Sequence, residues 1–403
     1  MGFWEEAQAL SPYLSALREE FHRHPEVSRQ EFWTAERIEA ELDAIGITNH
    51  RRVDETGVYA VFRGEQPGDR VITLRADIDA LAIQDEKREV SYCSQIPGRM
   101  HACGHDAHTA GLLGGAKLLF AHKAEFGGEV RLFFQQAEEI GYGGRVFVKE
   151  GLLAGSGRVF GVHMASDLAV GTVGVKPGPN NASVDHFTIT VTGKAAHVST
   201  PHLGVDALYI ASQIVVALQA LVTRRTSPVE PLLIGVGMLH SGTAYNIVAE
   251  EAVLEGTIRA CSVETRAQAK AELDALCKET AKLYGGTAEV VWEDFASPLI
   301  NDPGVCREAG AVVTDLFGPQ ALVTDRPLSL GGDDFAEFLL TVPGCYAYVG
   351  SASPDKPDTQ RAHHNNRFDI DEEALAVTAA LHAEYAARYL AGKIGQHTHF
   401  ISH

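Results

Sequence analysis

Short apolar runs alternate with helical segments through the first 163 residues, and this alternation restricts the fold more than any other feature. Strands are predicted at about 58–63, 71–75, 130–134 and 159–163, and helices at about 5–21, 31–45, 110–121 and 144–150. Such alternation favours an α/β fold with a mostly parallel sheet flanked by helices. Ligands bind such sheets beyond the carboxyl ends of the strands.

The pattern changes after the breaker cluster Pro177-Gly178-Pro179-Asn180-Asn181. Strands are then predicted at about 186–192, 232–238, 252–259 and 287–292, and helices at about 206–223 and 263–283. This β-α-β-β-α-β order favours a ferredoxin-like α+β domain with two helices on one face of an antiparallel sheet.

After Phe295–Pro298 the chain returns to the α/β pattern, with a strand at about 345–349 and a closing helix at about 371–390. We therefore expect a catalytic domain built from residues 1–180 and 295–403, and an inserted lid domain of residues 181–294. The active site is expected in the cleft between the two domains. The histidines beyond residue 395 are expected to belong to a loose tail.

Charge and hydropathy restrict the partners. The formal net charge of −19 argues against nucleic acid or an anionic membrane surface, and an anionic substrate would need a local cationic pocket. No apolar run approaches the roughly 18 residues that span a bilayer. We expect a small-molecule substrate.

Cysteine usage indicates the compartment. The six cysteines show no CxxC pairing, and residues 1–11 carry Glu5 and Glu6 without the basic start and apolar centre of a secretory signal. A reducing cytoplasm is expected, with the cysteines free or bound to metal.

The segment Met100–His108 holds three histidines, one cysteine and one aspartate in nine positions, directly before an apolar helix. Imidazole and thiolate are both good ligands for borderline divalent metals such as zinc. For any one of these residues alone, a buried cysteine or a solvated histidine is the simpler interpretation. The density of the cluster favours one half of a metal site.

Other candidate ligands follow predicted strands. Adjacent side chains on an extended segment point in opposite directions, so one of Glu138 and Glu139 can bind metal while the other acts as a general base. A solvated acidic pair, a core histidine at His163 and a surface histidine at His364 are the alternatives. Taken together, these residues suffice for two ions, roughly 3.5–4 Å apart, that share one bridging group. The candidate ligands are Cys103, His105, Glu139, His163 and His364.

The segments 101–108, 135–139, 161–163 and 364–368 resemble the motifs of the aminoacylase/carboxypeptidase family of dinuclear metallohydrolases. Within that family, the chain is most similar to the amidohydrolase branch of N-acyl-amino-acid amidohydrolases, hippurate hydrolases and auxin-conjugate hydrolases. The similarity runs from about Phe21 to Leu390, with the inserted domain in its expected place. It implies hydrolysis of the amide bond of N-acyl amino acids by metal-activated water with a glutamate as general base.

The resemblance also implies a ligand set. Cys103 becomes the bridging ligand, and His105, Glu139, His163 and His364 become the terminal ligands of two divalent ions per subunit. Zinc or manganese is expected first, and cobalt and nickel remain open.

Further roles are implied in the same way. Glu138 becomes the general base, and Asp77 a carboxylate that fixes the tautomer of a ligand imidazole. His197 becomes a group that reaches the active site of a partner subunit and stabilises the oxyanion, while Asn246 and Arg259 hold the substrate carboxylate. A homodimer through the lid domain, or a larger assembly, follows from this arrangement.

Two alternatives stay open. A metallo-carboxypeptidase or dipeptidase would use the same ligands with a different pocket. A non-catalytic metal-binding protein would lack Glu138 or a ligand, and none is missing. Several positions depart from the usual family pattern and leave the substrate preference open: Gln136, Ala165-Ser166, Asp333 and Asn366.

Overall fold

The computed structural model describes residues 2–395; Met1 and residues 396–403, where the histidine-bearing tail was expected, lie outside the described part. The chain separates into two compact units. Unit 1 comprises described residues up to 178, 301–327 and those from 334 onward, and unit 2 comprises Pro179–Ile300 and Leu328–Asp333. Residues 328–333, expected in the second catalytic segment, therefore group with the inserted unit, where Ser329 pairs with Asn181.

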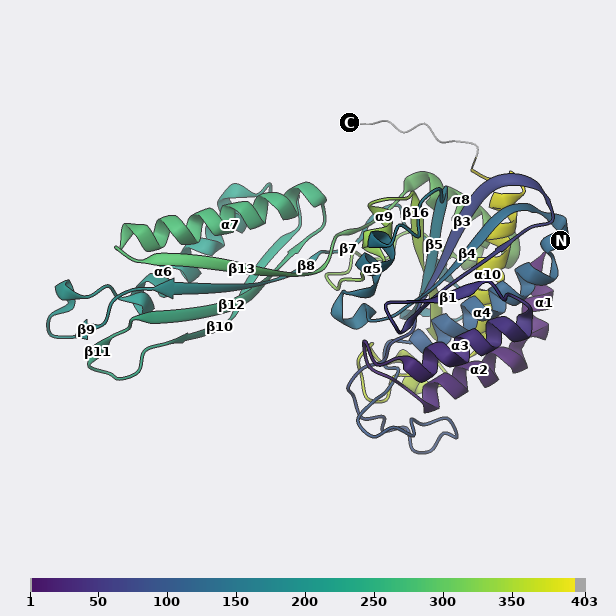
Figure 1. Cartoon of the computed structure of the whole chain (residues 1–403), viewed down its shortest axis with the longest axis horizontal. Helices are drawn as coiled ribbons and strands as arrows, with labels where there is room; N and C mark the ends of the chain where they lie inside the picture. Colours follow the sequence, from purple (N-terminus) through teal and green to yellow (C-terminus); the bar gives the residue numbers. More distant parts are fainter. Residues whose placement is uncertain (1, 396–403) are drawn as a thin grey trace. The chain divides into compact units, whose positions relative to one another are not determined.

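Unit 1 is built on an eight-stranded mixed sheet of order β1-β2-β4-β3-β5-β16-β6-β15 (Figure 1). Its strands are β1 (His50–Val53), β2 (Gly57–Arg63), β3 (Gln66–Asp77), β4 (Gly127–Gln135), β5 (Arg158–Ala169), β6 (Val173–Gly174), β15 (Leu322–Val323) and β16 (Gly344–Ala352). The central run β4-β3-β5-β16 is parallel, as predicted, whereas β1-β2-β4 and β16-β6 pair antiparallel. The carboxyl ends of the central strands therefore meet at one edge.

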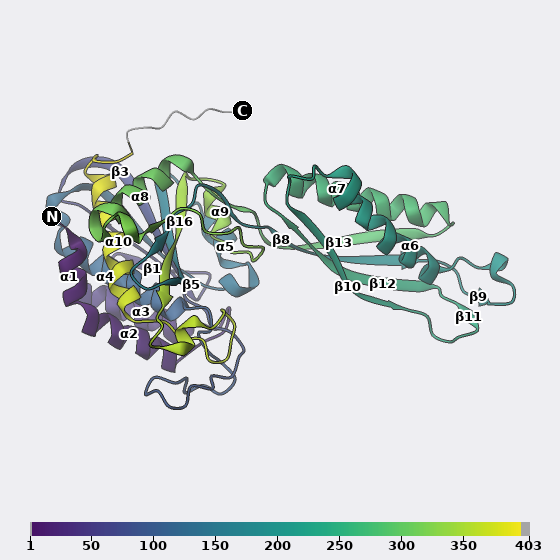
Figure 2. The same cartoon turned by 180° about the vertical axis from the view of Figure 1, so that it is seen from behind.

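Helices cover both faces of this sheet (Figures 1 and 2). They are α1 (Phe3–Ala9), α2 (Ser11–Arg23), α3 (Phe32–Ile45), α4 (His105–Ala121), α5 (Gly143–Lys149), α8 (Pro303–Phe317), α9 (Ala336–Leu339) and α10 (Glu373–Leu390). Successive side chains of β4 point to opposite faces of the sheet. Leu132 and Phe134 lie in the main core on the face covered by α4 and α10. Phe133 points to the other face, where it contacts Phe147 of α5 and Phe338 of α9.

Helices α4 and α10 pack unusually close because α4 carries glycines at the contact. A Cβ atom added at Gly111 would lie 2.3 Å from Cγ2 of Thr378. The helix that follows the ligand cluster is thereby held firmly against the core.

Two helix predictions need correction. The helix expected at 5–21 is divided into α1 and α2, because Pro12 lacks an N–H and suits only the first turn of a helix. The helix expected at 110–121 begins earlier, at His105, so that half of the ligand cluster lies in its first turns.

Unit 2 contains a four-stranded antiparallel sheet of order β10-β12-β8-β13, and its elements follow one another in the predicted β-α-β-β-α-β order. Its strands are β8 (Val184–Thr192), β10 (Leu232–Ser241), β12 (Glu251–Ala260) and β13 (Thr287–Ala296), and its helices are α6 (Ala207–Ala220) and α7 (Val263–Leu283). Phe187 and Ile189 of β8 form one core with Ile214 of α6 and Leu273 of α7. Two small pairs, β9 (Ala196–His197) with β11 (Ile247–Val248) and β7 (Gly178–Asn181) with β14 (Leu299–Asn301), complete the strands.

One helical stretch is rich in apolar residues, although polar residues interrupt it. The helical stretch Ala207–Arg225 is long and apolar enough, by length and composition alone, to cross a bilayer. Its residues Ile210, Ile214 and Leu218 are buried in the core of unit 2, whereas Leu208 and Val216 are exposed. The stretch therefore has two apolar sides, of which one is covered within the chain.

Candidate metal centre

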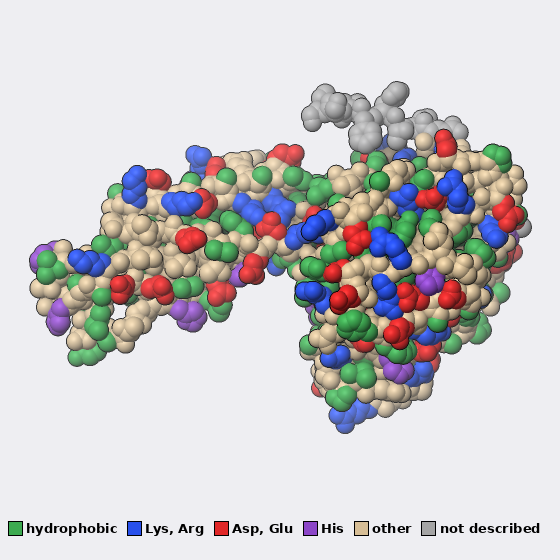
Figure 3. Space-filling model, in the orientation of Figure 1, with side chains coloured by type: hydrophobic (Ala, Val, Ile, Leu, Met, Phe, Trp, Pro, Cys, Tyr) green, Lys and Arg blue, Asp and Glu red, His purple; other side chains and the backbone are tan. Residues whose placement is uncertain are grey.

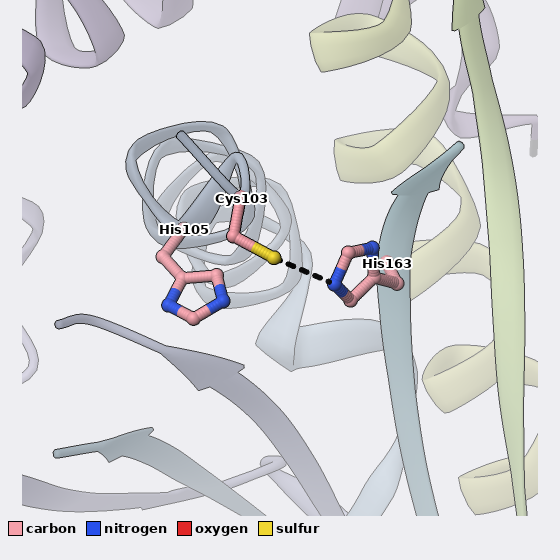
Figure 4. Close-up of side chains that lie close together, drawn as sticks. All are labelled: Cys103, His105 and His163. Atoms are coloured by element: carbon pink, nitrogen blue, oxygen red, sulfur yellow. Dashed lines mark hydrogen bonds between the residues drawn. The ribbon is translucent and has the colours of Figure 1, made fainter. Parts of the chain in front are cut away.

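Four segments of unit 1 bring the five predicted ligands together at the carboxyl edge of the sheet. Cys103 and His105 flank the start of α4, Glu139 lies in the 3-10 turn Glu138–Ile140 after β4, His163 lies on β5, and His364 lies ahead of α10. The donor atoms of Cys103, His105 and His163 (Figure 4) lie within 4.8 Å of one another. Those of Cys103, Glu139 and His364 form a second group with the same spacing limit. Cys103 belongs to both groups, as a bridging ligand would.

Main-chain carbonyls orient two of the imidazoles. Nδ1 of His105 donates to the carbonyl oxygen of Asp79 at 2.9 Å, and Nδ1 of His163 donates to that of Met164 at 2.6 Å. In each ring this leaves the Nε2 lone pair available to a metal ion. Nε2 of His163 lies 3.6 Å from Sγ of Cys103, and Nε2 of His364 lies 3.5 Å from Oε2 of Glu139.

Two potential metal-ligand atoms at the centre have no hydrogen-bond partner among residues 2–395. Nε2 of His105 and Oε1 of Glu139 are both buried and unpaired, 3.9 Å apart. Buried polar atoms nearly always have a hydrogen-bond partner, so two unpaired atoms of this kind need an explanation. A thiolate, imidazoles and a carboxylate around such atoms fit borderline divalent ions.

The electrostatics also favour a cation. Burial, together with the charges of Asp79 and Asp77, raises the pKa of Glu139 to about 7. Burial opposes the charged form of His105, but Asp77 and Asp79 nevertheless raise its pKa to about 10. Burial and neighbouring imidazoles hold the pKa of His163 well below its usual value, so this ring stays neutral. The carboxylates of Asp77 and Asp79 thus favour a positive charge at this centre, and a divalent ion would supply that charge in place of the second proton of His105.

Asp77 does not contact a ligand in the way expected. Its Oδ1 accepts from Nδ1 of His108 at 2.6 Å, and its Oδ2 accepts from Arg75 at 2.6 Å. Nε2 of His108 in turn accepts the N–H of Met164 at 2.8 Å. Asp77 thus fixes the tautomer of His108, whereas the main chain fixes that of His105. No role was assigned to His108 from sequence, although its position three residues after His105 places both on one helix face.

The orientation expected for the two glutamates is also wrong. Glu138 and Glu139 lie in one 3-10 turn instead of an extended segment, and a carboxylate oxygen of each lies within 4.8 Å of a nitrogen of His105. Oε2 of Glu138 lies 4.0 Å from Nε2 of His105, and the Glu138 side chain is almost fully buried. Both carboxylates therefore face the same centre.

Left-handed backbone conformations occur at three positions in the segments that carry the ligands. Gly104, Ala137 and His364 have φ angles of 89°, 53° and 66°. For Ala137 and His364 this conformation is strained, and such strain persists where the surroundings enforce it, commonly at functional sites.

The remaining three candidates lie in unit 2. His197 is exposed on β9, where its Nδ1 accepts from the backbone N–H and the hydroxyl of Ser199. Asn246 lies beside His197, since the backbone carbonyl of Asn246 accepts the N–H of Val198 at 3.1 Å. Arg259 is half-buried on β12, and its Nη1 is buried without a hydrogen-bond partner.

The strand register separates Arg259 from the other two. Glu251 pairs with Thr192 at the end of β12 near β9, whereas Ile258 pairs with Asp185 at the other end. At about 3.3 Å per residue, Arg259 lies roughly 25 Å along the sheet from the His197 end.

Thiolate, imidazole and carboxylate donors gathered at the edge of a parallel sheet, with a further carboxylate beside them, are typical of hydrolases that use a pair of divalent ions. The chain belongs to the peptidase family M20/M25/M40, whose family model matches residues 73–388. This confirms the resemblance inferred from the motifs, and the chain is a metal-dependent hydrolase that acts on amide bonds.

Relatives named for different activities match nearly the whole chain. An N-acetyl-L-cysteine deacetylase of Bacillus subtilis is 38% identical, over 94% of this chain and 89% of that protein. The thermostable carboxypeptidase 2 of Saccharolobus solfataricus is 34% identical, over 95% of this chain and 97% of that protein. The solved structure of the YXEP protein of Bacillus subtilis, described as a dinuclear metal-binding peptidase, has a TM-score of 0.82 at 34% identity, covering 95% of this chain and 99% of that one.

Proposed function

We propose that this enzyme hydrolyses the amide bond of N-acyl amino acids at a pair of divalent ions, zinc or manganese first, with cobalt or nickel as substitutes. The observation that carries this proposal is the set of buried, unpaired donors around Cys103, with Glu138 beside them. The name of the Bacillus subtilis deacetylase, an enzyme of an N-acetylated amino acid, supports the substrate class.

Glu138 is the general base in this proposal. When bound, the metal pair would polarise the scissile carbonyl and lower the pKa of the attacking water. Glu138 would accept the proton of that water and pass it to the leaving amine. Its almost complete burial limits competition from bulk solvent, which suits a proton carrier.

Arg259 is the proposed anchor of the substrate carboxylate. Burial lowers the pKa of Arg259, and its buried Nη1 has no acceptor in the described part of the chain. A carboxylate would supply two acceptors to the planar guanidinium. On the face in Figure 3, Lys and Arg side chains are interspersed with Asp and Glu, so a half-buried guanidinium with an unpaired buried nitrogen is a distinctive candidate for an anion site.

We further propose that His197 and Asn246 serve the active site of a partner subunit in a homodimer. A small substrate cannot reach Arg259 and His197 of one unit 2 at once, because they lie at opposite ends of its sheet. The exposed apolar side chains Leu208, Tyr209 and Val216 of α6 offer a surface for such an interface. Unit 2 would then act as lid and dimerisation domain. The six free cysteines agree with a reducing cytoplasm.

A carboxypeptidase or dipeptidase is the second candidate function. The 34% identity to the Saccharolobus carboxypeptidase supports it, and Arg259 would hold the terminal carboxylate of a peptide equally well.

A substrate panel separates the two. Release of the amino acid would be measured from N-acetyl, N-benzoyl and longer N-acyl amino acids and from dipeptides, after chelation and return of zinc, manganese, cobalt or nickel. Metal-dependent release from acyl substrates is expected. Release from dipeptides alone would show that the enzyme is a peptidase instead of an amidohydrolase. Inactivity with every metal would contradict the proposed function.

A further inference from the structure

The turn that carries Glu138 needs outside support. Ala137, two residues after the end of β4, adopts a left-handed conformation with φ 53° and ψ 42°, which is strained for an alanine. The next residues, Glu138–Ile140, form a single short 3-10 turn. A segment this short does not hold itself in place, so neighbouring groups must fix it.

Glu31 holds the residue before Glu138. Its Oε1 accepts the backbone N–H of Ala137 at 2.9 Å, and the Glu31 side chain is completely buried. It comes from the loop between α2 and α3, far from β4 in sequence.

Asp79 holds the residue after Glu138. Its Oδ2 accepts the backbone N–H of Glu139 at 3.0 Å and the hydroxyl of Ser28 at 2.7 Å. The 26–31 loop is itself joined to this segment, since Val27 bridges to Ala80. Two carboxylates from separate segments therefore bind the amides on either side of Glu138.

Burial of the Glu31 carboxyl group near Asp79 lowers the stability of the fold, so packing alone does not explain it. Glu31 is buried near Asp79, and burial together with the charge of Asp79 raises the pKa of Glu31 to about 7. An apolar side chain would fill the same space without bringing a carboxyl group out of water. Glu31 also has a hydrogen bond with the Thr56 side chain, but its bond to the strained turn is the one that joins it to the residue before Glu138, and placement of that turn explains the buried acid better than packing does.

We propose that Glu31, supported by the Ser28–Asp79 contact, is a positioning residue that sets the location of the Glu138 carboxylate through the backbone of Ala137. This inference rests on the proposed function, in which Glu138 is the general base.

Four variants test the proposal on the metal-loaded enzyme. Glu31→Ala removes the acceptor for Ala137. Glu31→Gln keeps an acceptor oxygen at the same reach, and Glu31→Asp draws the carboxylate back by about one bond length. Glu26→Ala is the matched control: Glu26 lies in the same loop but accepts from Trp33 and Thr34 at the start of α3 instead of from the catalytic turn.

The expected signature is a split between kcat and KM. Glu31→Ala should lower kcat by about 10²-fold, the order expected for a displacement of roughly 1 Å, with KM and metal content unchanged. Glu31→Asp should lower kcat with little change in Tm, and Glu31→Gln should retain most of kcat. Glu26→Ala should lower Tm without lowering kcat of the folded enzyme.

Other outcomes would overturn the proposal. If kcat follows the folded fraction in every variant, or if Glu31→Gln is as slow as Glu31→Asp, Glu31 has only a structural role. Should Glu31→Ala fail to fold, the comparison of Glu31→Asp with Glu31→Gln decides the question. Glu138→Ala, assayed in parallel, separates the proposed function from this inference. High activity of Glu138→Ala contradicts Glu138 as the general base. If Glu138→Ala is inactive while the Glu31 variants stay active, only the positioning role of Glu31 is contradicted.

Discussion

Three neighbouring histidines have different roles because their ring nitrogens have different partners. His105 and His163 donate Nδ1–H to backbone carbonyls and keep Nε2 for the metal centre. His108 uses both nitrogens within the protein, one with Asp77 and one with the N–H of Met164. Residue type alone does not distinguish ligand from support; the partner of the second nitrogen does.

At this scale the first prediction concerns the base. Glu138→Ala should keep its metal, because the five proposed ligands remain, while kcat falls by about 10²–10⁴-fold, the range of general acid–base catalysis. Metal content by mass spectrometry and amino-acid release measure the two quantities. Loss of metal together with activity would make Glu138 a ligand instead of a base.

The second prediction concerns the substrate anchor. Arg259→Met should raise KM for N-acyl amino acids by about 10–100-fold, since hydrogen bonds to a charged group contribute roughly 1.5–3 kcal/mol. Substrates with a carboxamide in place of the carboxylate should show little difference between variant and wild type. An equal loss for both substrates would contradict the anchor role.

At the scale of elements, a buried ionic cluster joins α2 to the segments that carry ligands. Arg18 of α2 donates to Asp106, next to His105, at 2.9 Å and to Asp369, beyond His364, at 2.6 Å. His22 lies 2.7 Å from Asp106 as well. The side chains of Arg18, His22 and Asp106 are almost wholly buried, so these ion pairs are shielded from solvent.

Removal of the Arg18 charge should therefore destabilise the fold strongly. Arg18→Met should lower the free energy of unfolding by about 3–5 kcal/mol, because it leaves buried carboxylates without their cation. Arg23→Met removes a partly exposed pair with Glu19 on the same helix and should cost about 0–1 kcal/mol. Denaturant unfolding of both variants measures the difference, and similar losses would contradict the assigned importance of burial.

The same cluster predicts a sensitivity to acid. Burial alone would raise the pKa of Asp369, but Arg18 and Lys87 hold it below its usual range. A carboxyl whose pKa is depressed in the folded state stabilises the fold above its unfolded pKa of about 3.9, and this contribution is lost as the pH falls through the folded value. Tm should therefore fall between pH 5 and pH 3, about the onset of that loss. Asp369→Asn should start lower and fall less steeply over this interval; an unchanged slope would contradict the assignment.

At the scale of the whole molecule, the proposal that His197 acts across a dimer has a direct test. Glu138→Ala and His197→Ala subunits should each be nearly inactive alone. After mixing and reassembly, a mixed dimer would hold one site with an intact Glu138 and an intact His197 from its partner, so activity should return. No recovery, with mixed dimers verified by differential tagging, would place His197 within its own subunit or outside the active site.

The amino-acid sequence by itself determined the features that depend on local pattern. Alternating apolar runs specified the strands, their β-α-β-β-α-β order specified the ferredoxin-like unit, and the motifs specified five side chains that meet in one centre. Periodicity and breakers act over a few residues, so they can be read without a structure.

Only the tertiary structure decided the contacts between segments distant in the chain. It shows that Asp77 accepts a hydrogen bond from His108 and that Glu138 and Glu139 face the same centre. It also shows that Glu31 accepts the backbone N–H of Ala137. Hydrogen-bond partners of buried groups depend on which segments pack together, and no local pattern carries that information. The sequence therefore specified which groups take part, and packing specified what each one binds.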